Sequence, residues 1–557
     1  MITLGICNDE TASACLFENG NLIAAASEER FSRKKLDNSF PFKSIEYVLS
    51  CSSHDIDNIN VAYSWTKGFD PEILKYYMKR FSECETEEER SILQERIDYD
   101  ISRDESNKNE FFDWYSGDSL NHYYHHESHA ASSCLLSSFD DGICLTADGR
   151  GDFESLVIWK FNRFNKEKPF KRLFSVTSAD SLGYFYGRIT GLLGFKPMRH
   201  EGKITGLAAY GNPHKALSLM EDMITFNDGN LKGKLGELYR PFFKPYSDKL
   251  VNEIKKFSRE DIASAAQYHL EKILCDVVTY VLSQNNITST NLMLAGGIFG
   301  NVKVTQKLKE LSIIKSVFVQ PHMGDGGLCI GAAALSQHQS GIQIKPLQNV
   351  YLGPSIDLDS FVNDKKYSHL NIERCDDCYD NICSDLLDNK VIGLVRGRME
   401  FGPRALCHRS IIYRTSDVTI NDWINKRLNR TEFMPFAPVI RKELAEKSFI
   451  NYKEDDRTLE FMTSTIDCTD EFAKISPAVT HVDQTARPQI VSKEIEPFIW
   501  GLLKKWEKIS GEFSLVNTSF NAHEEPIICT YQEALHALEK NRVDIVYIEN
   551  YRITNYV

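Results

Sequence analysis

The segment Tyr124-His-His-Glu-Ser-His129 carries two imidazole side chains, those of His125 and His129, four residues apart. If this segment begins a helix, both imidazoles lie on the same helix face. A histidine pair at this spacing can bind one divalent metal ion, but it needs further oxygen or nitrogen ligands. Asp148 and Asp325 are candidate ligands, since each lies in a glycine-rich turn after a predicted strand. The alternative is that the histidines only begin a polar surface helix.

Three glycine-rich turns follow predicted strands, at residues 148–152, 295–297 and 324–327. Glycine allows the backbone to approach a phosphate group and to direct its N–H groups at it. Several such turns in one α/β unit favour phosphate binding, although each turn alone can be a simple tight turn. The chain contains neither a Walker A nor a GxGxxG sequence, which disfavours the common P-loop and dinucleotide-binding folds.

A third cluster of candidate residues is basic. Arg396, Arg398, Arg404 and Arg409 fall within fourteen residues, directly after an apolar run. Arginine matches the oxygens of phosphate and carboxylate groups with paired hydrogen bonds. We therefore expect an anion site here, which residues 428–438 and 517–521 could complete. The alternative is that these arginines only hold loops together through backbone carbonyl groups.

The predicted elements that position these groups form two α/β units. In the first, apolar runs predict strands at 2–6, 14–17, 22–26, 143–146, 156–159, 291–294 and 317–319, and helices at 301–311 and 328–335. The Asn19-Gly20 pair predicts a tight hairpin, because both residues tolerate positive φ. The pattern breaks around residues 340–355, so we place the first domain at 1–345 and the second at 346–557.

The second unit is also predicted to be α/β, with strands at 391–395, 514–516 and 543–548 and helices at 420–428 and 532–540. Two more helices are expected in the first unit. One follows Pro41, with Phe42, Ile45, Val48 and Leu49 on one face. The other is the highly charged stretch 83–104, which predicts a solvated helix on the surface.

Composition limits the class of protein. The 557 residues, 42% of them apolar, are enough for two large domains with substantial cores. The net charge is 65 − 78 = −13, which argues against a dedicated binder of nucleic acid or anionic membranes. No apolar run reaches membrane-spanning length, and the N-terminus does not resemble a signal peptide. The 14 scattered cysteines indicate reduced thiols in a cytoplasmic protein rather than a disulfide framework.

The order of these segments resembles that of the ATP-dependent carbamoyltransferases of the nodulation-factor, cephamycin and tobramycin type. The resemblance covers nearly the whole chain. It is carried by residues 27–34 (SEERFSRK), 125–129 (HHESH), 202–211 (GKITGLAAYG), 295–297 (AGG), 324–327 (GDGG), 400–406 (EFGPRAL), 434–438 (MPFAP) and 517–521 (NTSFN). So many ordered segments together are far more specific than any single one.

The resemblance implies an N-terminal ASKHA (actin-like) domain, similar to the transferase component of the tRNA threonylcarbamoyl system, and a C-terminal YrdC-like domain. In this family, carbamoyl phosphate and ATP give carbamoyl adenylate in the C-terminal domain, with release of pyrophosphate and phosphate. The carbamoyl group then passes to an acceptor in the metal-bearing N-terminal domain. By position, His125, His129, Asp148 and Asp325 would hold one Fe²⁺ ion per chain.

The resemblance also assigns roles to further residues. The nucleotide or adenylate would contact Gly149, Gly151, Gly296, Gly297, Asn301, Gly324 and Gly326. Carbamoyl phosphate and ATP, the latter with Mg²⁺, would contact Arg396, Arg398, Arg404, Arg409, Arg430, Asn517, Ser519 and Asn521. The residues expected to act in catalysis are Glu10, Lys203 and Arg404.

The chain departs from the family in two places. Family members commonly carry Gly-His-Asp before Ala-Ser-Ala near the first hairpin, where this chain has Asp9, Glu10 and Thr11. The expected general base is therefore Glu10, with an unperturbed pKa near 4.3 against about 6.5 for histidine. Three alternatives follow for Glu10. It acts as the base if burial raises its pKa. Otherwise it binds a cationic acceptor, or it marks a loss of transfer activity. The family's glycine and asparagine after Ala-Leu are Cys407 and His408 here.

We therefore predict a carbamoyltransferase that modifies a hydroxyl or amino group of a small metabolite, in natural-product or antibiotic biosynthesis. Two alternatives stay open. One is an ASKHA-type small-molecule kinase, which would release ADP. The other is a non-catalytic nucleotide-binding protein that has lost transfer through the change to Glu10. The expected partners are carbamoyl phosphate, ATP and the acceptor, without nucleic acid or membrane, and a homodimer is one option for the assembly.

Overall fold

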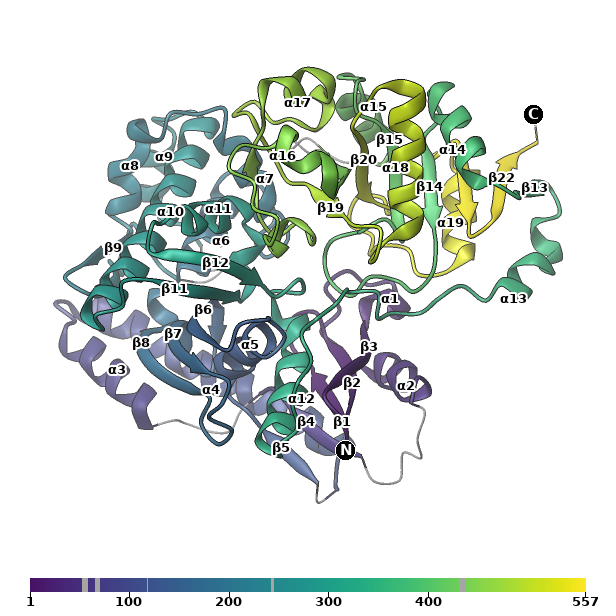
Figure 1. The fold of residues 1–557 in the computed structure, drawn as a ribbon. Coiled ribbons are helices and arrows are strands. Elements are labelled where there is room, and N and C mark those ends of the chain that lie inside the picture. The colour runs from purple at the N-terminus through teal and green to yellow at the C-terminus, as the bar shows by residue number, and fades with distance from the viewer. Residues whose placement is uncertain (53–58, 66–70, 118, 242–244, 430–435, 557) are drawn as a thin grey trace. The chain divides into compact units, whose positions relative to one another are not determined.

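The computed structural model describes residues 1–52, 59–65, 71–117, 119–241, 245–429 and 436–556 (Figure 1). The chain forms two compact units. The first comprises Met1–Ile23 and Asn38–Leu347, and the second comprises Ala24–Asp37 and Gln348–Val557. The short segment 24–37, which the sequence analysis assigns to the first domain, thus belongs to the second unit.

Two five-stranded sheets form the framework of the first unit, except that residues 24–27, at the end of one strand, are counted with the second unit. One consists of β1 (Ile2–Cys7), β2 (Ser13–Glu18), β3 (Asn21–Ser27), β4 (Asn60–Tyr63) and β5 (Leu120–His122), in the order β3-β2-β1-β4-β5. Strand β1 pairs antiparallel with β2 and parallel with β4, and β4 pairs parallel with β5. The predicted hairpin is confirmed, since Asn19 and Gly20 both have positive φ, at 48° and 81°.

The second sheet repeats this plan. Its strands are β6 (Asp141–Gly151), β7 (Glu154–Asn162), β8 (Phe170–Thr177), β11 (Thr290–Ala295) and β12 (Ile314–Val319), in the order β12-β11-β6-β7-β8. Here β6 pairs antiparallel with β7 and parallel with β11, and β11 pairs parallel with β12. In both sheets a central strand lies between an antiparallel hairpin and two parallel strands. This duplicated arrangement confirms the predicted α/β class and the actin-like plan of the unit.

Helices cover these sheets, and one of them, α5 (His125–Cys134), carries two of the predicted metal ligands. Helix α5 packs against α12 (Leu328–Gln339) and β6, and α12 also packs on β1. The others are α2 (Phe42–Ser50), α3 (Pro71–Ser82), α4 (Glu87–Trp114), α6 (Leu182–Leu192), α7 (Glu201–Ala208), α8 (Pro213–Glu221), α9 (Asp248–Ile254), α10 (Arg259–Gln284) and α11 (Val302–Lys309), with a small hairpin β9 (Ile224–Asn227) and β10 (Asn230–Gly233). In α2 the predicted apolar face is wrong at one position, because Phe42 is 60% exposed.

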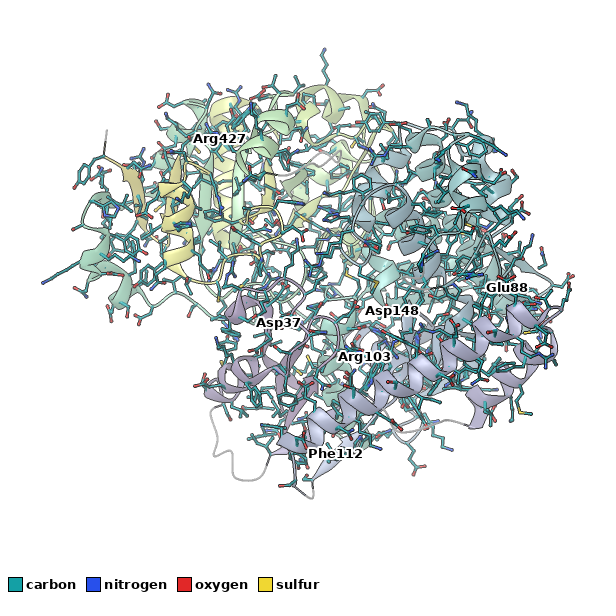
Figure 2. All side chains as sticks on the ribbon, turned by 180° about the vertical axis from the view of Figure 1, so that it is seen from behind. Asp37, Glu88, Arg103, Phe112, Asp148 and Arg427 are labelled. Atoms are coloured by element: carbon teal, nitrogen blue, oxygen red, sulfur yellow. The ribbon has the colours of Figure 1, made fainter. Side chains whose placement is uncertain are left out.

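Helix α4 differs most from expectation. Figure 2 shows it extending from Glu88 past Arg103 to Phe112. The charged sequence predicts a solvated helix, but one face is buried at intervals of three or four residues: Glu89, Leu93, Arg96, Asp100, Asp104, Asn107 and Phe111. Most of these side chains are polar, so the apolar periodicity that marks a packed helix is missing from the sequence.

The second unit is built on an eight-stranded mixed sheet in the order β13-β22-β21-β14-β15-β20-β16-β19. The strands are β13 (Leu370–Arg374), β14 (Ile392–Val395), β15 (Arg409–Arg414), β16 (Ala437–Arg441), β19 (Gln489–Val491), β20 (Ser514–Ser519), β21 (Ile545–Ile548) and β22 (Tyr551–Asn555). Helices α14 (Cys378–Leu387) and α18 (Pro497–Ser510) pack on each other, and α19 (Tyr531–Glu539) packs on β14, β21 and β22. The α/β class is thus confirmed here too.

The remaining elements of the second unit are short: α1 (Glu29–Ser32), α13 (Leu358–Val362), α15 (Ile420–Arg427), α16 (Ala445–Ser448), α17 (Asp470–Ile475), β17 (Ile466–Asp467) and β18 (Thr485–Ala486). In the part of the chain that the structure describes, no helix has the length and apolar character needed to cross a bilayer.

Candidate active site

The first unit brings four predicted metal ligands together. His125 and His129 lie one turn apart on α5, Asp148 lies in β6, and Asp325 lies in the turn before α12. One ligand atom from each lies within 4.8 Å of those of the other three. The Nε2 atom of His129 is 3.2 Å from Asp148 Oδ2 and 3.5 Å from Asp325 Oδ1, and His125 Nε2 is 3.7 Å from the same Asp325 oxygen.

The electrostatics of this cluster show strong coupling between its members. Burial lowers the pKa of His129, but the two carboxylates outweigh it and raise that pKa to about 9. Burial and the charge of Asp148 raise the pKa of Asp325 to about 8. Burial also acts on Asp148, but His129 and two backbone N–H groups hold the pKa of Asp148 below its ordinary value. The two carboxylates therefore stabilise a positive charge between these side chains, as the raised pKa of His129 shows.

The donor atoms fit a divalent transition metal. The Nε2 atoms of both histidines and the Oδ1 atom of Asp325 are buried, and none makes a hydrogen bond with a described residue. A buried polar atom without a partner costs free energy, so such atoms usually face a ligand. Two imidazole nitrogens and two carboxylate oxygens form a donor set suited to iron or zinc. No residue outside the predicted four is needed to form this cluster.

The glycine turns serve this cluster structurally. The N–H groups of Gly149 and Gly297 donate to the two Asp148 oxygens, at 2.6 Å and 2.7 Å, and so orient the carboxylate. Gly296 has φ +107°, and a Cβ there would lie 2.1 Å from the carbonyl oxygen of Ala147. A Cβ on Gly151 would lie 2.1 Å from the His125 ring. Both positions therefore require glycine because neighbouring protein atoms approach the backbone closely, whether or not a phosphate binds there.

Of the other predicted nucleotide contacts, Gly324 and Gly326 lie beside Asp325 in the same turn. A Cβ on Gly324 would have the Gly297 Cα as its nearest neighbour, at 3.9 Å. Asn301 caps α11 and exchanges side-chain hydrogen bonds with Gln267, at 2.8 Å and 3.1 Å. The amide of Asn301 is thus already engaged. Its contact with a nucleotide stays a prediction, as does that of the glycines.

The two predicted catalytic residues of this unit differ in position. Glu10 lies in the loop after β1 and is partly buried. Burial raises the pKa of Glu10 to about 8, and the charges of Asp325, Asp9 and Asp148 add to the shift, so its carboxyl lies close to the metal cluster. Lys203 is buried on α7, with its Nζ 5.7 Å from the centre of the Phe195 ring. It is not a member of the four-residue cluster.

In the second unit, three of the predicted anion-binding arginines are engaged with the backbone. Arg396 donates to the carbonyl oxygen of Glu549 at 2.8 Å and Arg398 to that of Gly353 at 3.2 Å. Arg409 donates to the carbonyl oxygens of Arg396, at 2.7 Å, and Pro354, at 3.0 Å. These contacts match the structural alternative, in which arginines hold the loop together.

The fourth arginine of this cluster, Arg404, has a charged neighbour that the sequence analysis missed. Burial lowers the pKa of Arg404 to about 10, and burial together with the charge of Arg404 lowers the pKa of Arg487 well below its ordinary value. Among the described residues, no acceptor reaches the Nε atom of Arg487. Guanidinium groups remain charged in proteins, so two partly buried ones that repel each other favour an anion beside them. Arg430 lies outside the described residues.

Asn517 connects the two loops that carry these arginines. Its Nδ2 atom donates to the carbonyl oxygen of Ala405, next to Arg404, and to the Oε1 atom of Gln489, at 3.1 Å and 2.7 Å. The Asn517 Oδ1 atom is buried and has no hydrogen-bond partner among the described residues. Ser519 ends β20, and Asn521 donates to the carbonyl oxygens of Ala522 and Glu525, so it shapes the following turn.

Cys407 and His408, the second of the two places where the chain departs from the family, lie in this arginine loop. Cys407 has φ +74°, a conformation that glycine adopts without strain. The His408 ring stacks on Tyr351 at 3.7 Å, its Nδ1 atom lies 2.6 Å from the carbonyl oxygen of Arg398, and its Nε2 atom lies 3.2 Å from Glu496. Because a carbonyl oxygen only accepts, His408 Nδ1 carries a proton there. The departure therefore adds contacts that brace the loop.

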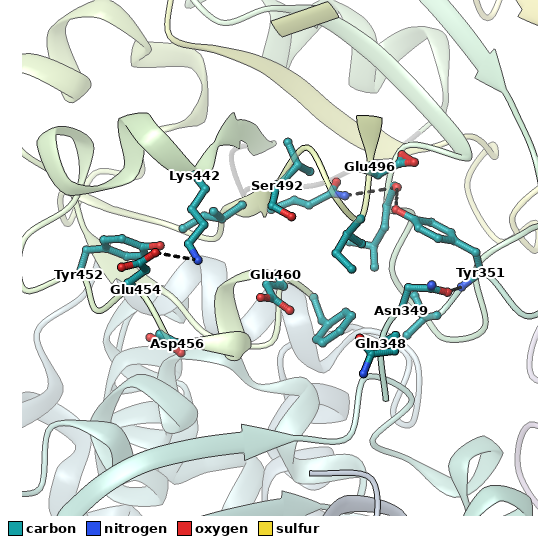
Figure 3. A pocket seen from close by; sticks show the side chains of 17 residues that line it. Gln348, Asn349, Tyr351, Lys442, Tyr452, Glu454, Asp456, Glu460, Ser492 and Glu496 are labelled. Atoms are coloured by element: carbon teal, nitrogen blue, oxygen red, sulfur yellow. Dashed lines mark hydrogen bonds and ion pairs between the residues drawn. The ribbon is translucent and has the colours of Figure 1, made fainter. Parts of the chain in front are cut away.

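A cavity of about 70 Å³ lies on one side of this loop (Figure 3). Tyr351, Leu406 and Gln489 contribute to its wall. The charged residues around it are mostly acidic: Glu454, Asp456, Glu460 and Glu496, with Lys442 paired to Glu454 at 3.1 Å. This negative lining disfavours a phosphate in the cavity, so the guanidinium pair remains the better anion site.

Comparisons with known proteins agree with this picture. The model for the carbamoyltransferase N-terminus matches residues 3–334, and that for the carbamoyltransferase C-terminus matches residues 383–555. Nodulation protein NolNO of Sinorhizobium fredii is 31% identical over 97% of this chain and 78% of its own length. An uncharacterized protein of Methanocaldococcus jannaschii is 31% identical over 99% of both chains.

Similar solved structures include full-length HypF in its phosphate- and nucleotide-bound form, with 15% identity and a TM-score of 0.35 over 60% of this chain and 55% of that one. Component A of (R)-2-hydroxyglutaryl-CoA dehydratase from Acidaminococcus fermentans has 12% identity and a TM-score of 0.33, over 61% of this chain and 99% of that one. These TM-scores are too low to support an argument about the fold. The actin-like plan follows from the strand order of the two sheets.

The chain thus combines an actin-like α/β unit, which holds the four-residue cluster, with a second α/β unit. Since the two models together span most of the sequence, this chain belongs to the carbamoyltransferase family.

Proposed function

We propose that this transferase makes carbamoyl adenylate from carbamoyl phosphate and ATP in the second unit, and transfers the carbamoyl group to a hydroxyl or amino group of a small metabolite in the first. The observation that carries this proposal is the buried cluster of His125, His129, Asp148 and Asp325 in an actin-like unit of a carbamoyltransferase. The acceptor is proposed to be a natural-product intermediate.

In the first step, the anions must be brought together. Water cleaves carbamoyl phosphate to carbamate and phosphate, and the carbamate oxygen then attacks the α-phosphorus of ATP and displaces pyrophosphate. All participants are negatively charged and repel one another, so fixed positive charge is needed to position them. Arg404 and Arg487 supply this charge, while Asn517 holds their two loops at a fixed separation.

In the second step, the acceptor oxygen or nitrogen attacks the carbamoyl carbon, and the bond from this carbon to the AMP oxygen breaks. A metal ion held by the four ligands would supply positive charge that stabilises the AMP leaving group. Glu10 takes the proton from the acceptor, a role for which a carboxylate with a raised pKa is suited. The Gly149 and Gly297 N–H groups keep Asp148 in place during the reaction.

The proposal is tested by incubating the chain, Fe²⁺, Mg²⁺-ATP and carbamoyl phosphate with a pool of small hydroxylated and amino metabolites. We expect AMP and pyrophosphate to form only when carbamoyl phosphate is present, and mass spectrometry to show a product heavier by one carbamoyl group. ADP formation without carbamoyl phosphate would indicate the kinase alternative. Nucleotide binding without any turnover would indicate the non-catalytic alternative.

A further inference from the structure

Side chains of α4 contact two segments near the predicted metal ligands: the end of β6 and the loop after β1. Asp100 and Asp104 of α4 both contact Arg150, whose Nη1 atom lies 3.4 Å and 2.9 Å from their carboxylate oxygens. Arg150 is two residues from Asp148 in β6. Helix α4 therefore fixes the end of β6 that carries Asp148, one of the predicted metal ligands, although α4 itself contributes none.

The same helix also reaches the loop that carries Glu10. The Asp9 Oδ1 atom accepts two hydrogen bonds, from the backbone N–H of Glu10 at 2.9 Å and from Arg103 Nη2 on α4 at 3.1 Å. Its other oxygen lies 4.0 Å from Arg150. Asp9 is 6% exposed, and a buried carboxylate must be paired. Asp9 is thus neutralised by arginines and is not available to bind a cationic acceptor.

A second contact strengthens this connection between α4 and the loop. The Asn8 Nδ2 atom donates to the carbonyl oxygen of Asn107 and to the Glu110 side chain, at 3.0 Å and 3.1 Å. Both acceptors belong to α4. Two consecutive loop residues, Asn8 and Asp9, are therefore held by the helix directly before Glu10.

The ion pairs of this network join three carboxylates to three arginines. Asp9, Asp100 and Asp104 carry three negative charges, and Arg96, Arg103 and Arg150 carry three positive charges. Without Arg103, the Asp9 Oδ1 atom would keep only the Glu10 N–H, and the nearest guanidinium, that of Arg150, is shared with two other acids. The Asp9 carboxylate would then be free to rotate. The Glu10 N–H would still donate to it, but to an acceptor that is no longer held in place.

We propose that Arg103 is a positioning residue of the transfer step, which fixes the Asp9 carboxylate and, through its hydrogen bond to the Glu10 N–H, the position of the Glu10 side chain. This inference rests on the proposed function, because it concerns the step in which Glu10 accepts a proton. It assigns a task to the charged helix, and it concerns Asp9 and Glu10, which stand where the family commonly has Gly-His.

The test compares Arg103→Met, Arg103→Lys and a matched control, Arg90→Met, in which an exposed arginine of the same helix is removed. Four quantities are measured for each variant: pyrophosphate release in a single turnover, kcat and acceptor KM of transfer, Fe²⁺ affinity by calorimetry, and melting temperature. We expect Arg103→Met to lower kcat of transfer at least about tenfold, since small misplacements of catalytic groups cost one to two orders of magnitude.

Pyrophosphate release, acceptor KM, Fe²⁺ affinity and melting temperature distinguish a role of Arg103 in positioning Glu10 from a general structural defect. In Arg103→Met, pyrophosphate release, acceptor KM and Fe²⁺ affinity should match those of Arg90→Met, and Arg103→Lys should recover most of kcat because a lysine can still pair with Asp9. If Arg103→Met transfers as fast as Arg90→Met, or loses Fe²⁺ affinity and pyrophosphate release equally, the inference is wrong while the proposed function stands. If the wild-type chain transfers no carbamoyl group, both are wrong.

Discussion

The Asp152 carboxylate accepts a hydrogen bond from the backbone N–H of His125 and thereby caps helix α5 from a distant strand end. Tyr124, at the N-cap position itself, makes no side-chain cap. The first N–H groups of a helix lack partners within the helix, so the Asp152 carboxylate satisfies one of them at the residue that also offers a metal ligand. Sequence reasoning missed Asp152, because a cap is usually sought just before the helix.

We therefore expect Asp152→Ala to lower the free energy of unfolding by about 1–2 kcal/mol, the usual range for loss of a helix cap, and to weaken Fe²⁺ binding. Asp152→Asn is the matched control, since it keeps an oxygen acceptor and tolerates the positive φ of 46° at this position. Urea denaturation and calorimetric Fe²⁺ titration measure the two effects. Equal stability of both variants would contradict the capping role.

Removal of the metal should separate the two half-reactions. We expect a chelator to abolish carbamoyl transfer but to leave carbamoyl-phosphate-dependent pyrophosphate release, because the arginine pair is in the other unit. His129→Ala should behave in the same way and should lose Fe²⁺ binding by calorimetry, since two carboxylates and one imidazole remain. His126→Asn is the control on the same helix, because His126 Nδ1 contacts Thr146 and His126 is outside the cluster. Loss of pyrophosphate release in the chelated protein would contradict the assignment of the steps.

Arg487→Met should change activity and stability in opposite directions. Removing one of two partly buried like charges relieves repulsion, so the melting temperature should stay the same or rise. Removing a contact to carbamoyl phosphate or ATP should raise the KM of one of them and lower pyrophosphate release by about tenfold or more, because charge-assisted hydrogen bonds contribute about 1.5–3 kcal/mol. Arg374→Met, at an exposed position of the same unit, should leave both unchanged. A drop in melting temperature without a change in KM would indicate a structural arginine.

The transfer rate should rise with pH. In the proposed transfer step the carboxylate form of Glu10 is the base, and burial with the nearby acids raises the pKa of Glu10 to about 8 from an ordinary value of 4.5. The rate therefore falls as the pH drops through that pKa, and a cation held by Asp148 and Asp325 shifts the midpoint to lower pH because it offsets their charges. The measurement is a pH profile of single-turnover transfer, with a midpoint between about 5 and 8. In Glu10→Gln the fall in rate at low pH should disappear. If the pH profile of Glu10→Gln matches that of the wild-type chain, Glu10 is not the base.

The sequence alone predicted the features that depend on short spacing. The Asn19-Gly20 hairpin follows from two residues that tolerate positive φ, and the pairing of His125 with His129 follows from the helical repeat. Strands such as β11 and β12 were visible as apolar runs, because strands buried within a sheet need apolar side chains. The ordered motifs also indicated the family, which the comparisons confirm.

Only the tertiary structure decided which polar residues meet across long distances in the chain. The charge of Arg404 acts on Arg487 although 83 positions separate them, and Asp9 is held by Arg103 of a helix for which the sequence predicts a solvated surface position. Whether an arginine binds an anion or a backbone carbonyl depends on the loop that surrounds it, as Arg396 and Arg409 show. Local periodicity records which side of an element is apolar, but a buried charge is stabilised by partners from other elements, and no spacing in the sequence encodes them.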